Sequence, residues 1–436
     1  MTAHTDQRVA MLSLISEQAI PNVMAALLVN PRPRTLVCLL PEDKERKGQV
    51  DREFEHVFNG IRDALGQIAP DIQVLNWTSR GRGQPVNPYN ADQVKQACQA
   101  IRRDPRFADV SWVYNITGGT KVMAQATLDD ARANNCRALY VDTEYRRLIW
   151  DGENPVGFDE EWQRSVGVKE YLTAYGVEVT SFKATLADDL RQAARLLCKS
   201  HAGPSLVQKV KGSETPRRNE EINRSFGPND LSQAEQQLLL QVTEILSGRS
   251  VEVHKASDGI ELSLWTIDKG VYDFFWQGRW LEGFVFDTVC RLGQRDSSWR
   301  YNLPWRNVAL KWAGIEFSGL QETASGSSVR PKNELDVAAT RGARLLVCEC
   351  KTGKRALDPG NVYKLQVIGH KLGTFADKVL VTDRPALFDP PSQNVVRALT
   401  LDIVLVQASQ LPALDEILSN PEKELQRQKR LLGLAV

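Results

Sequence analysis

The sequence predicts an α/β protein in which two differently built sheets form separate domains. Short apolar runs alternate with longer amphipathic runs over residues 1–150, which is typical of a parallel sheet with helices on both faces. From Gly278 onward the expected order is helix, three strands, helix, strand, which favours a small mixed sheet with a helix on each side. With 436 residues, 42% of them apolar, the chain is long enough for two or three domains.

The first 150 residues are expected to contain five strands and four helices. The predicted strands are the apolar runs 12–15, 35–40, 72–77, 110–116 and 138–141. The predicted helices are the amphipathic runs 21–29, 50–65, 91–101 and 121–133. Pro21 falls in the first turn of the first helix, where proline is well tolerated. This order predicts a Rossmann-like, doubly wound sheet.

Residues 151–275 are expected to be a connector that is helical and in part flexible. Helices are predicted over 184–197 and 231–246, the second with Ser232 as its N-cap and Glu235 three residues on. Residues 202–230 are rich in Pro, Gly, Ser, Asn and charge, which predicts a linker or a long loop. The predicted domains are therefore 1–150, 151–275 and 276–436.

The last domain begins with a helix that has one continuous apolar face. The predicted elements are a helix over 280–292, a strand within 308–317, strands over 334–339 and 344–351, a helix over 361–372 and a strand over 378–381. Residues 345–348 are apolar at every position, which is typical of a central strand.

Composition limits the classes of function. The net charge of +1 implies no nucleic-acid or membrane partner through overall electrostatics, so a binding surface must come from local patches. Seven cysteines without paired spacing suit a reducing cytoplasm, and the lone Cys348–Cys350 pair does not predict a zinc site. The N-terminus is polar before Met11, and the longest apolar run, 23–29, is too short to cross a bilayer.

Two carboxylates are expected to meet near the end of the predicted hairpin at 334–351. Gly342 lies between the two strands, and an antiparallel turn centred at 342–343 places Asp336 opposite Glu349. Glu349 and Lys351 are two residues apart on one strand and share a face. A charged pair at the end of a buried strand needs partners or a metal.

Carboxylates held a few ångströms apart repel unless a cation lies between them, and a hard divalent cation prefers oxygen ligands. Such a metal activates water and stabilises charge on a phosphate under attack, and Lys351 is placed to contact that phosphate or the water. Glu282, on the helix before the sheet, is a third carboxylate aimed at the same site, and Cys350 is a further candidate ligand. A surface salt-bridge cluster is the alternative interpretation, but the order of elements and Glu282 favour the metal site.

Residues 278–382 resemble the PD-(D/E)xK, or restriction-endonuclease-like, nuclease fold, with Asp336, Glu349, Lys351 and Glu282 at its motif positions. Leu335 stands where the superfamily name has proline, and Gln366 matches a further common position more weakly. Five basic residues farther on are candidates to follow a phosphate backbone, namely Lys354, Arg355, Lys364, His370 and Lys371.

A second motif, NITGGTK at 115–121, joins a predicted strand directly to a predicted helix. Paired glycines let the backbone turn sharply and approach a ligand, and the helix start offers N–H groups to an anion. The motif fits neither a Walker-type loop nor a dinucleotide fingerprint. A second loop, SEQAIPN at 16–22, follows the first strand, and both loops lie at the edge of a doubly wound sheet that forms the ligand crevice. A Gly-Gly turn without a ligand is the alternative.

These two loops carry a resemblance of residues 1–150 to the CARF domain, the Rossmann-like sensor of CRISPR-associated proteins. The resemblance implies a two-fold homodimer that binds a cyclic oligoadenylate between its protomers. It also implies the ligand-binding residues, which are Ser16, Gln18, Asn22, Asn115, Thr117, Gly118, Gly119, Thr120 and Lys121.

A CARF domain followed by this nuclease resembles the DUF-type CARF–nuclease effectors of type III CRISPR defence. The resemblance implies activation by cyclic tetra-adenylate and metal-dependent cleavage with manganese or magnesium. The substrate is nucleic acid, either single-stranded RNA or DNA or supercoiled DNA, and the sequence leaves that choice open. Two alternatives also stay open: a repair or restriction nuclease that needs no ligand, and a non-catalytic sensor or regulator.

Overall fold

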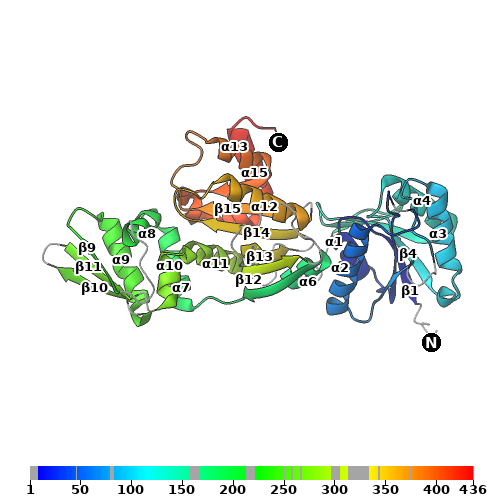
Figure 1. The fold of residues 1–436 in the computed structure, drawn as a ribbon, viewed down its shortest axis with the longest axis horizontal. Coiled ribbons are helices and arrows are strands. Elements are labelled where there is room, and N and C mark those ends of the chain that lie inside the picture. Colours follow the sequence, from blue (N-terminus) through cyan, green and yellow to red (C-terminus); the bar gives the residue numbers. More distant parts are fainter. Residues whose placement is uncertain are drawn as a thin grey trace, which may run out of the picture.

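The computed structural model consists of two large sheets and one small sheet arranged in a row (Figure 1). The N-terminal sheet lies at one end, the C-terminal sheet in the middle and the connector sheet at the other end. The residues that the structure describes are 8–45, 47–78, 83–157, 166–212, 221–249, 251–256, 259–265, 268–295, 305–312, 333–341, 344–373 and 376–435.

The N-terminal sheet has seven strands in the order β3-β2-β1-β4-β5-β6-β7. Its strands are β1 (Val9–Leu14), β2 (Thr35–Leu39), β3 (Gln73–Asn76), β4 (Ser111–Asn115), β5 (Arg137–Asp142), β6 (Arg147–Trp150) and β7 (Val156–Gly157). Strands β1 to β5 are parallel, which confirms the predicted doubly wound sheet, and the unpredicted β6 and β7 add an antiparallel edge. Every residue of β1 is buried, as expected for a central parallel strand.

Four helices cover this sheet close to the predicted positions. They are α1 (Ile20–Leu28), α2 (Arg52–Ile68), α3 (Ala91–Arg103) and α4 (Lys121–Ala133). The chain order of the strands reverses between β1 and β4, so the loops after these two strands meet at a topological switch point.

The C-terminal sheet has six strands in the order β16-β15-β14-β13-β12-β8. They are β8 (Val177–Lys183), β12 (Trp305–Trp312), β13 (Asn333–Arg341), β14 (Arg344–Lys351), β15 (Asp377–Thr382) and β16 (Ile403–Val406). Its helices are α11 (Arg279–Arg295), α12 (Pro359–Lys371), α13 (Gln393–Thr400), α14 (Leu414–Ser419) and α15 (Pro421–Leu431). The mixed sheet predicted here is confirmed. The part of the predicted strand beyond Trp312 lies outside the described residues.

The connector contains a three-stranded antiparallel sheet of order β10-β11-β9 as well as helices. Its elements are α7 (Asp188–Lys199), α8 (Gly203–Lys211), β9 (Glu221–Phe226), α9 (Gln233–Ile245), β10 (Val251–Ala256), β11 (Gly259–Trp265) and α10 (Lys269–Phe275). The prediction of a loop over 202–230 was therefore wrong for α8 and β9. Pro204 lies in the first turn of α8, where proline does not disturb a helix. In β9 the buried Ile222 and Phe226 are separated by polar residues, so the polar composition of the segment concealed a strand.

The N-terminal and C-terminal sheets share an apolar core through the short helix α6 (Val168–Ala174). Ile15 and Ile61 of the N-terminal domain and Leu365 and Leu380 of the C-terminal domain belong to the same buried cluster as Tyr171 of α6. A second buried cluster lies on the other face of the C-terminal sheet and extends into the connector.

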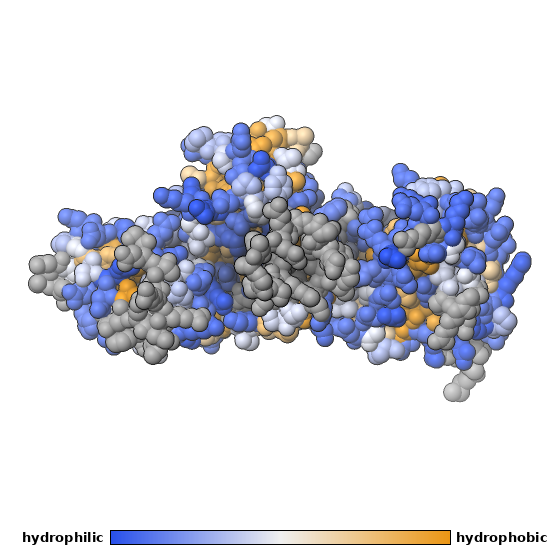
Figure 2. Space-filling view, in the orientation of Figure 1, coloured by the Kyte–Doolittle hydropathy of each residue, from blue (hydrophilic) through white to orange (hydrophobic). Residues whose placement is uncertain are grey.

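The face of the molecule drawn in Figure 2 is mostly hydrophilic, with small apolar patches scattered over it. Among the described residues, no helix has both the length and the apolar character needed to cross a membrane.

Candidate functional sites

The predicted register of the β13–β14 hairpin is confirmed. Val337 pairs with Cys348 and Arg341 with Arg344, and the same register continued by one pair sets Asp336 opposite Glu349. These carboxylates lie toward the end of β13 and β14 that is opposite the hairpin turn.

Glu349 is 1% exposed, and two ammonium groups hold its carboxylate. Its Oε1 lies 2.6 Å from Lys351 Nζ and 3.0 Å from Lys364 Nζ. Lys364, which comes from α12, also donates to the carbonyl oxygen of Glu334 at 3.0 Å. Lys364 was expected to follow a phosphate backbone, but its ammonium instead lies on the buried carboxylate of Glu349.

Asp336 is buried and accepts a hydrogen bond from the Cys350 backbone N–H at 2.7 Å, and its Oδ2 lies 3.4 Å from Lys351 Nζ. Burial, then the charges of Glu349 and Glu282, raises the pKa of Asp336 to about 7. Burial alone would lower the pKa of Lys351, but Asp336 and Glu349 outweigh it and raise that pKa. The site therefore holds an excess of negative charge.

Glu282 lies in the first turn of α11 and is half-buried. Its charge contributes to the raised pKa of Asp336 and also to that of the Cys350 thiol, so it belongs to the same electrostatic cluster. Burial raises the pKa of Cys350 well above its ordinary value, so this thiol stays protonated. Cys350 can thus offer a metal its carbonyl oxygen rather than a thiolate.

Within the part of the chain that the structure describes, no three acidic, histidine or cysteine side chains already converge as a metal cage. Two lysine ammonium groups contact the Glu349 carboxylate instead. The donor set nevertheless suits a hard cation, because the carboxylates of Asp336, Glu349 and Glu282 interact electrostatically and oxygen is the ligand that such a cation prefers.

The NITGGTK loop approaches the end of β1 so closely that a side chain has no room. A Cβ on Gly118 would lie 2.1 Å from the carbonyl oxygen of Leu14. Gly119 has φ +74°, a conformation that favours glycine. Thr120 caps α4 by accepting from the Met123 N–H at 3.2 Å, and its hydroxyl donates to the Pro88 carbonyl. Lys121, the first residue of the helix, is exposed.

Three buried polar side chains tie the two loops together beneath the switch point. Asn115 Nδ2 donates to Ser13 Oγ at 2.8 Å and to Asn22 Oδ1 at 3.0 Å. Asn115 Oδ1 in turn accepts from the Thr117 N–H at 3.1 Å. Asn22 and Asn115 therefore position the loops, whereas Ser16 and Gln18 remain partly exposed. Ser13 was missed, although a lone serine in an apolar strand was a visible signal.

A line of contacts joins the first loop to the C-terminal domain. Tyr175, directly after α6, donates its hydroxyl to Gln18 Oε1 at 3.1 Å, and its ring centroid lies 5.3 Å from that of Tyr171. Tyr171 donates its hydroxyl to the carbonyl oxygen of Leu372 at 2.9 Å. Leu372 caps α12, the helix that supplies Lys364 to Glu349. This path was not predicted; its one local signal in the sequence is the spacing of Tyr171 and Tyr175, one helical turn apart.

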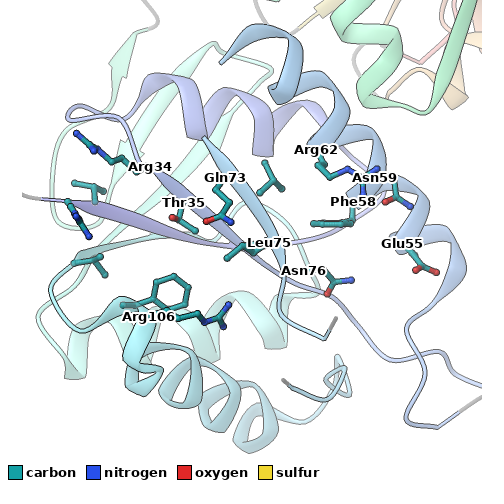
Figure 3. Close-up of a pocket in the computed structure, with 15 residues that line it drawn as sticks. Arg34, Thr35, Glu55, Phe58, Asn59, Arg62, Gln73, Leu75, Asn76 and Arg106 are labelled. Atoms are coloured by element: carbon teal, nitrogen blue, oxygen red, sulfur yellow. The ribbon is translucent and has the colours of Figure 1, made fainter. Parts of the chain in front are cut away.

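A groove of about 840 Å³ lies elsewhere on the N-terminal domain and is lined by arginines (Figure 3). Arg8 and Arg34 stand at the amino ends of β1 and β2, so the groove lies at the opposite edge from the two predicted ligand loops. Arg62 and Arg106, which also line it, pair with neighbouring aspartates. The groove is therefore separate from the switch-point site.

Comparison with known proteins agrees with this architecture. Residues 272–425 match the family profile described as Card1-like, endonuclease domain. Protein VC1899 from Vibrio cholerae superposes with a TM-score of 0.69 at 19% identity, covering 96% of this chain and 98% of that one. Can2 from Sulfobacillus thermosulfidooxidans, solved with cyclic tetra-adenylate, gives a TM-score of 0.62 at 19% identity, covering 95% and 96%.

A type III CRISPR defence DNA nuclease activated by cyclic oligoadenylate gives a TM-score of 0.50 at 15% identity, and covers 92% of this chain but 48% of that one. No curated protein matches the sequence. The fold is thus a Rossmann-like CARF domain joined to a restriction-endonuclease-like domain. The resemblance to CARF–nuclease effectors is confirmed, and the endonuclease-domain match supports nuclease activity.

Proposed function

We propose that this protein is a metal-dependent endonuclease that a cyclic oligoadenylate switches on, acting in type III CRISPR defence. The observation that carries the nuclease part is the buried pair Asp336 and Glu349, which meets Lys351 at the end of the β13–β14 hairpin. Burial first, and then the charges of Glu349 and Glu282, raises the pKa of Asp336, and a cation bound beside these carboxylates would favour their charged forms.

In this proposal Glu282, Asp336 and Glu349 hold magnesium or manganese, with the carbonyl oxygen of Cys350 as a further ligand. The metal, when bound, supplies an activated water and stabilises charge on the phosphate. Lys351 donates to the attacked phosphate or orients the attacking water. Lys364 positions Glu349 from the side of α12.

The proposed activator is cyclic tetra-adenylate, the compound with which the structurally similar Can2 was solved. It would lie over the switch point, bound by the N–H groups of 117–121, by Lys121 and by the partly exposed Ser16 and Gln18, between two protomers of a homodimer. Asn22 and Asn115 would shape this site from beneath.

The contacts of Gln18, Tyr175, Tyr171 and Leu372 support the coupling of the two sites. A ligand that engages Gln18 competes with its hydrogen bond to Tyr175, and the effect reaches the end of α12 through packed side chains. Activation then means that the ligand favours one of two arrangements of α12 and Lys364 around Glu349.

The test is cleavage of labelled single-stranded RNA, single-stranded DNA and supercoiled plasmid, with manganese, each with and without cyclic tetra-adenylate. We expect cleavage only with the activator, and none from Asp336→Asn or Glu349→Ala, either of which removes a metal ligand. Equal cleavage without the activator would favour a repair or restriction nuclease instead. Cleavage by the two variants at the wild-type rate would refute the assigned site.

A further inference from the structure

A hollow of about 540 Å³ lies between the connector and the catalytic end of the nuclease sheet. One wall is the end of α8 with Lys211 and Gly212. The other wall is formed by the two loops that follow β14 and β15, with Gly353, Lys354, Asp383 and Arg384. The hollow begins two residues after Lys351, so it adjoins the proposed site of cleavage.

The hollow is rich in cations that have no ion-pair partner. Lys211, Lys354 and Arg384 make no salt bridge with any described residue. Asp383 is buried, and its Oδ1 accepts a hydrogen bond from the Gly353 N–H at 2.8 Å. Burial lowers the pKa of Lys211, although Asp383 opposes this effect. Asp383 offsets the cost of this half-buried ammonium only in part, and an anion in the hollow would relieve the rest.

Lys211 is held in place by the connector rather than carried on a loose surface. Arg224 of β9 donates to the carbonyl oxygens of Lys211 at 2.9 Å and Val210 at 3.3 Å, which caps the end of α8. Lys209 pairs with the buried Glu235 of α9 at 2.8 Å. On the opposite wall, Arg384 donates to the Lys354 carbonyl oxygen at 3.2 Å, which fixes the distance between the two loops.

We propose that this hollow binds the phosphodiester backbone of the substrate strand beside the phosphate being cut, with α8 of the connector as its second wall. The connector is then part of the substrate-binding surface, with Lys211, Lys354 and Arg384 as the phosphate contacts. All three side chains are cations, which bind phosphate oxygens regardless of sequence, so we expect them to contact the backbone and not the bases. This inference rests on the proposed nuclease function.

The experiment measures binding of a fluorescein-labelled single strand, of DNA in one arm and of RNA in the other, to the full chain carrying Asp336→Asn, with cyclic tetra-adenylate present. Fluorescence anisotropy is recorded over a range of salt concentrations. Adding Lys211→Ala is expected to weaken binding about three- to ten-fold and to reduce the slope of log K against log salt by about 0.7. Lys211→Arg should restore both values.

Lys269→Ala is the matched control, because Lys269 is an exposed connector lysine at the start of α10, outside the hollow. It should change neither the affinity nor the slope. If the Asp336→Asn parent binds strand and Lys211→Ala binds it equally well, this inference is wrong while the nuclease proposal stands. If the parent binds neither strand, this inference is wrong for single-stranded substrates, and the cleavage assay with supercoiled plasmid decides the nuclease proposal separately. An effect confined to DNA or to RNA supports the inference and names the strand.

Discussion

Among the individual residues, Asp336 ties the chemistry of the site to the stability of the fold. Its pKa is raised from the ordinary 3.8 to about 7, so the folded protein binds this proton more tightly than the unfolded chain does. The resulting stabilisation is complete below the unfolded-state pKa and is lost as the pH rises through about 7. A cation between the carboxylates would compensate for this loss at neutral pH and above.

Asp336→Asn is therefore expected to remove most of this pH dependence. In EDTA, the wild-type protein should lose up to roughly 4 kcal/mol of stability between about pH 4 and about pH 8 relative to the variant. Manganese at about pH 8 should raise the unfolding midpoint of the wild type and leave the variant unchanged. Thermal unfolding across this pH range measures both effects. Parallel curves for the two proteins would contradict the assigned pKa.

Gly118 gives a prediction about the second site. A methyl group there would meet the Leu14 carbonyl oxygen at 2.1 Å, so Gly118→Ala must push the NITGGTK loop away from β1. The expected cost is about 1–3 kcal/mol of stability, with weaker binding of cyclic tetra-adenylate. Gly66→Ala is the control, because Gly66 lies in α2 with open space around its Cα, and it should be neutral or stabilising. Calorimetric binding and unfolding measurements compare the two.

At the scale of helices and strands, the sequence predicted the elements whose signals are local. Gly342 and the apolar run 345–348 were enough to predict the hairpin and its register, and Ser232 with Glu235 forms the predicted capping box. Strand β8 was missed because its partner β12 lies more than a hundred residues away, and nothing local encodes such a pairing. The hydrogen bond from Lys364 to Glu349 was missed for the same reason, since it depends on where α12 packs.

Helix α6 is the element that joins the two domains most directly. Its residue Tyr171 is buried in the core shared by both sheets, and its end packs so closely on α2 that a Cβ on Gly60 would lie 2.3 Å from the Ala174 carbonyl oxygen. Thr340, near the turn of the β13–β14 hairpin, donates to the carbonyl of Val166, just before α6. A displacement at α2 or at the first loop therefore reaches the nuclease sheet through packed atoms.

Tyr171→Phe tests this path, because it removes the hydroxyl that donates to Leu372 and keeps the ring. We expect the acceleration by cyclic tetra-adenylate to fall about five-fold or more, while the affinity for the ligand changes little. Tyr363→Phe is the control, since Tyr363 is an exposed tyrosine of α12. Paired cleavage and calorimetric titrations separate the two effects. If Tyr171→Phe and Tyr363→Phe reduce the acceleration equally, the loss does not depend on the Tyr171 hydroxyl. The proposed path would then have no support.

Across the whole molecule, the two proposed sites lie in different domains, one at the loops after β1 and β4 and the other at the β13–β14 hairpin. The arginine-lined groove lies at the opposite edge of the N-terminal sheet from the switch point. The proposed ligand site is therefore argued from the switch point of the sheet and not from the arginine-lined groove.

This arrangement predicts that Arg34→Ala leaves the affinity for cyclic tetra-adenylate within about two-fold of wild type, since Arg34 lines the groove and not the switch point. Lys121→Ala, at the start of α4, should weaken binding about ten-fold by removing one charged contact to phosphate. Calorimetric titration of both variants tests the location of the site. The reverse order of effects would move the ligand to the groove.

Strand β8 has a practical consequence for anyone who wishes to make the nuclease part alone. It precedes helices α7 to α10 of the connector in the chain and yet forms the edge of the C-terminal sheet, next to β12. A fragment cut at the limits of the matched family, 272–425, would lack this strand and present the bare backbone of β12 to solvent. Bare edges of this kind recruit other chains, so such a fragment would aggregate. During synthesis, β8 is made before the connector helices and β12 is made after them. Strand β8 can therefore pair with β12 only once the whole connector has been synthesised.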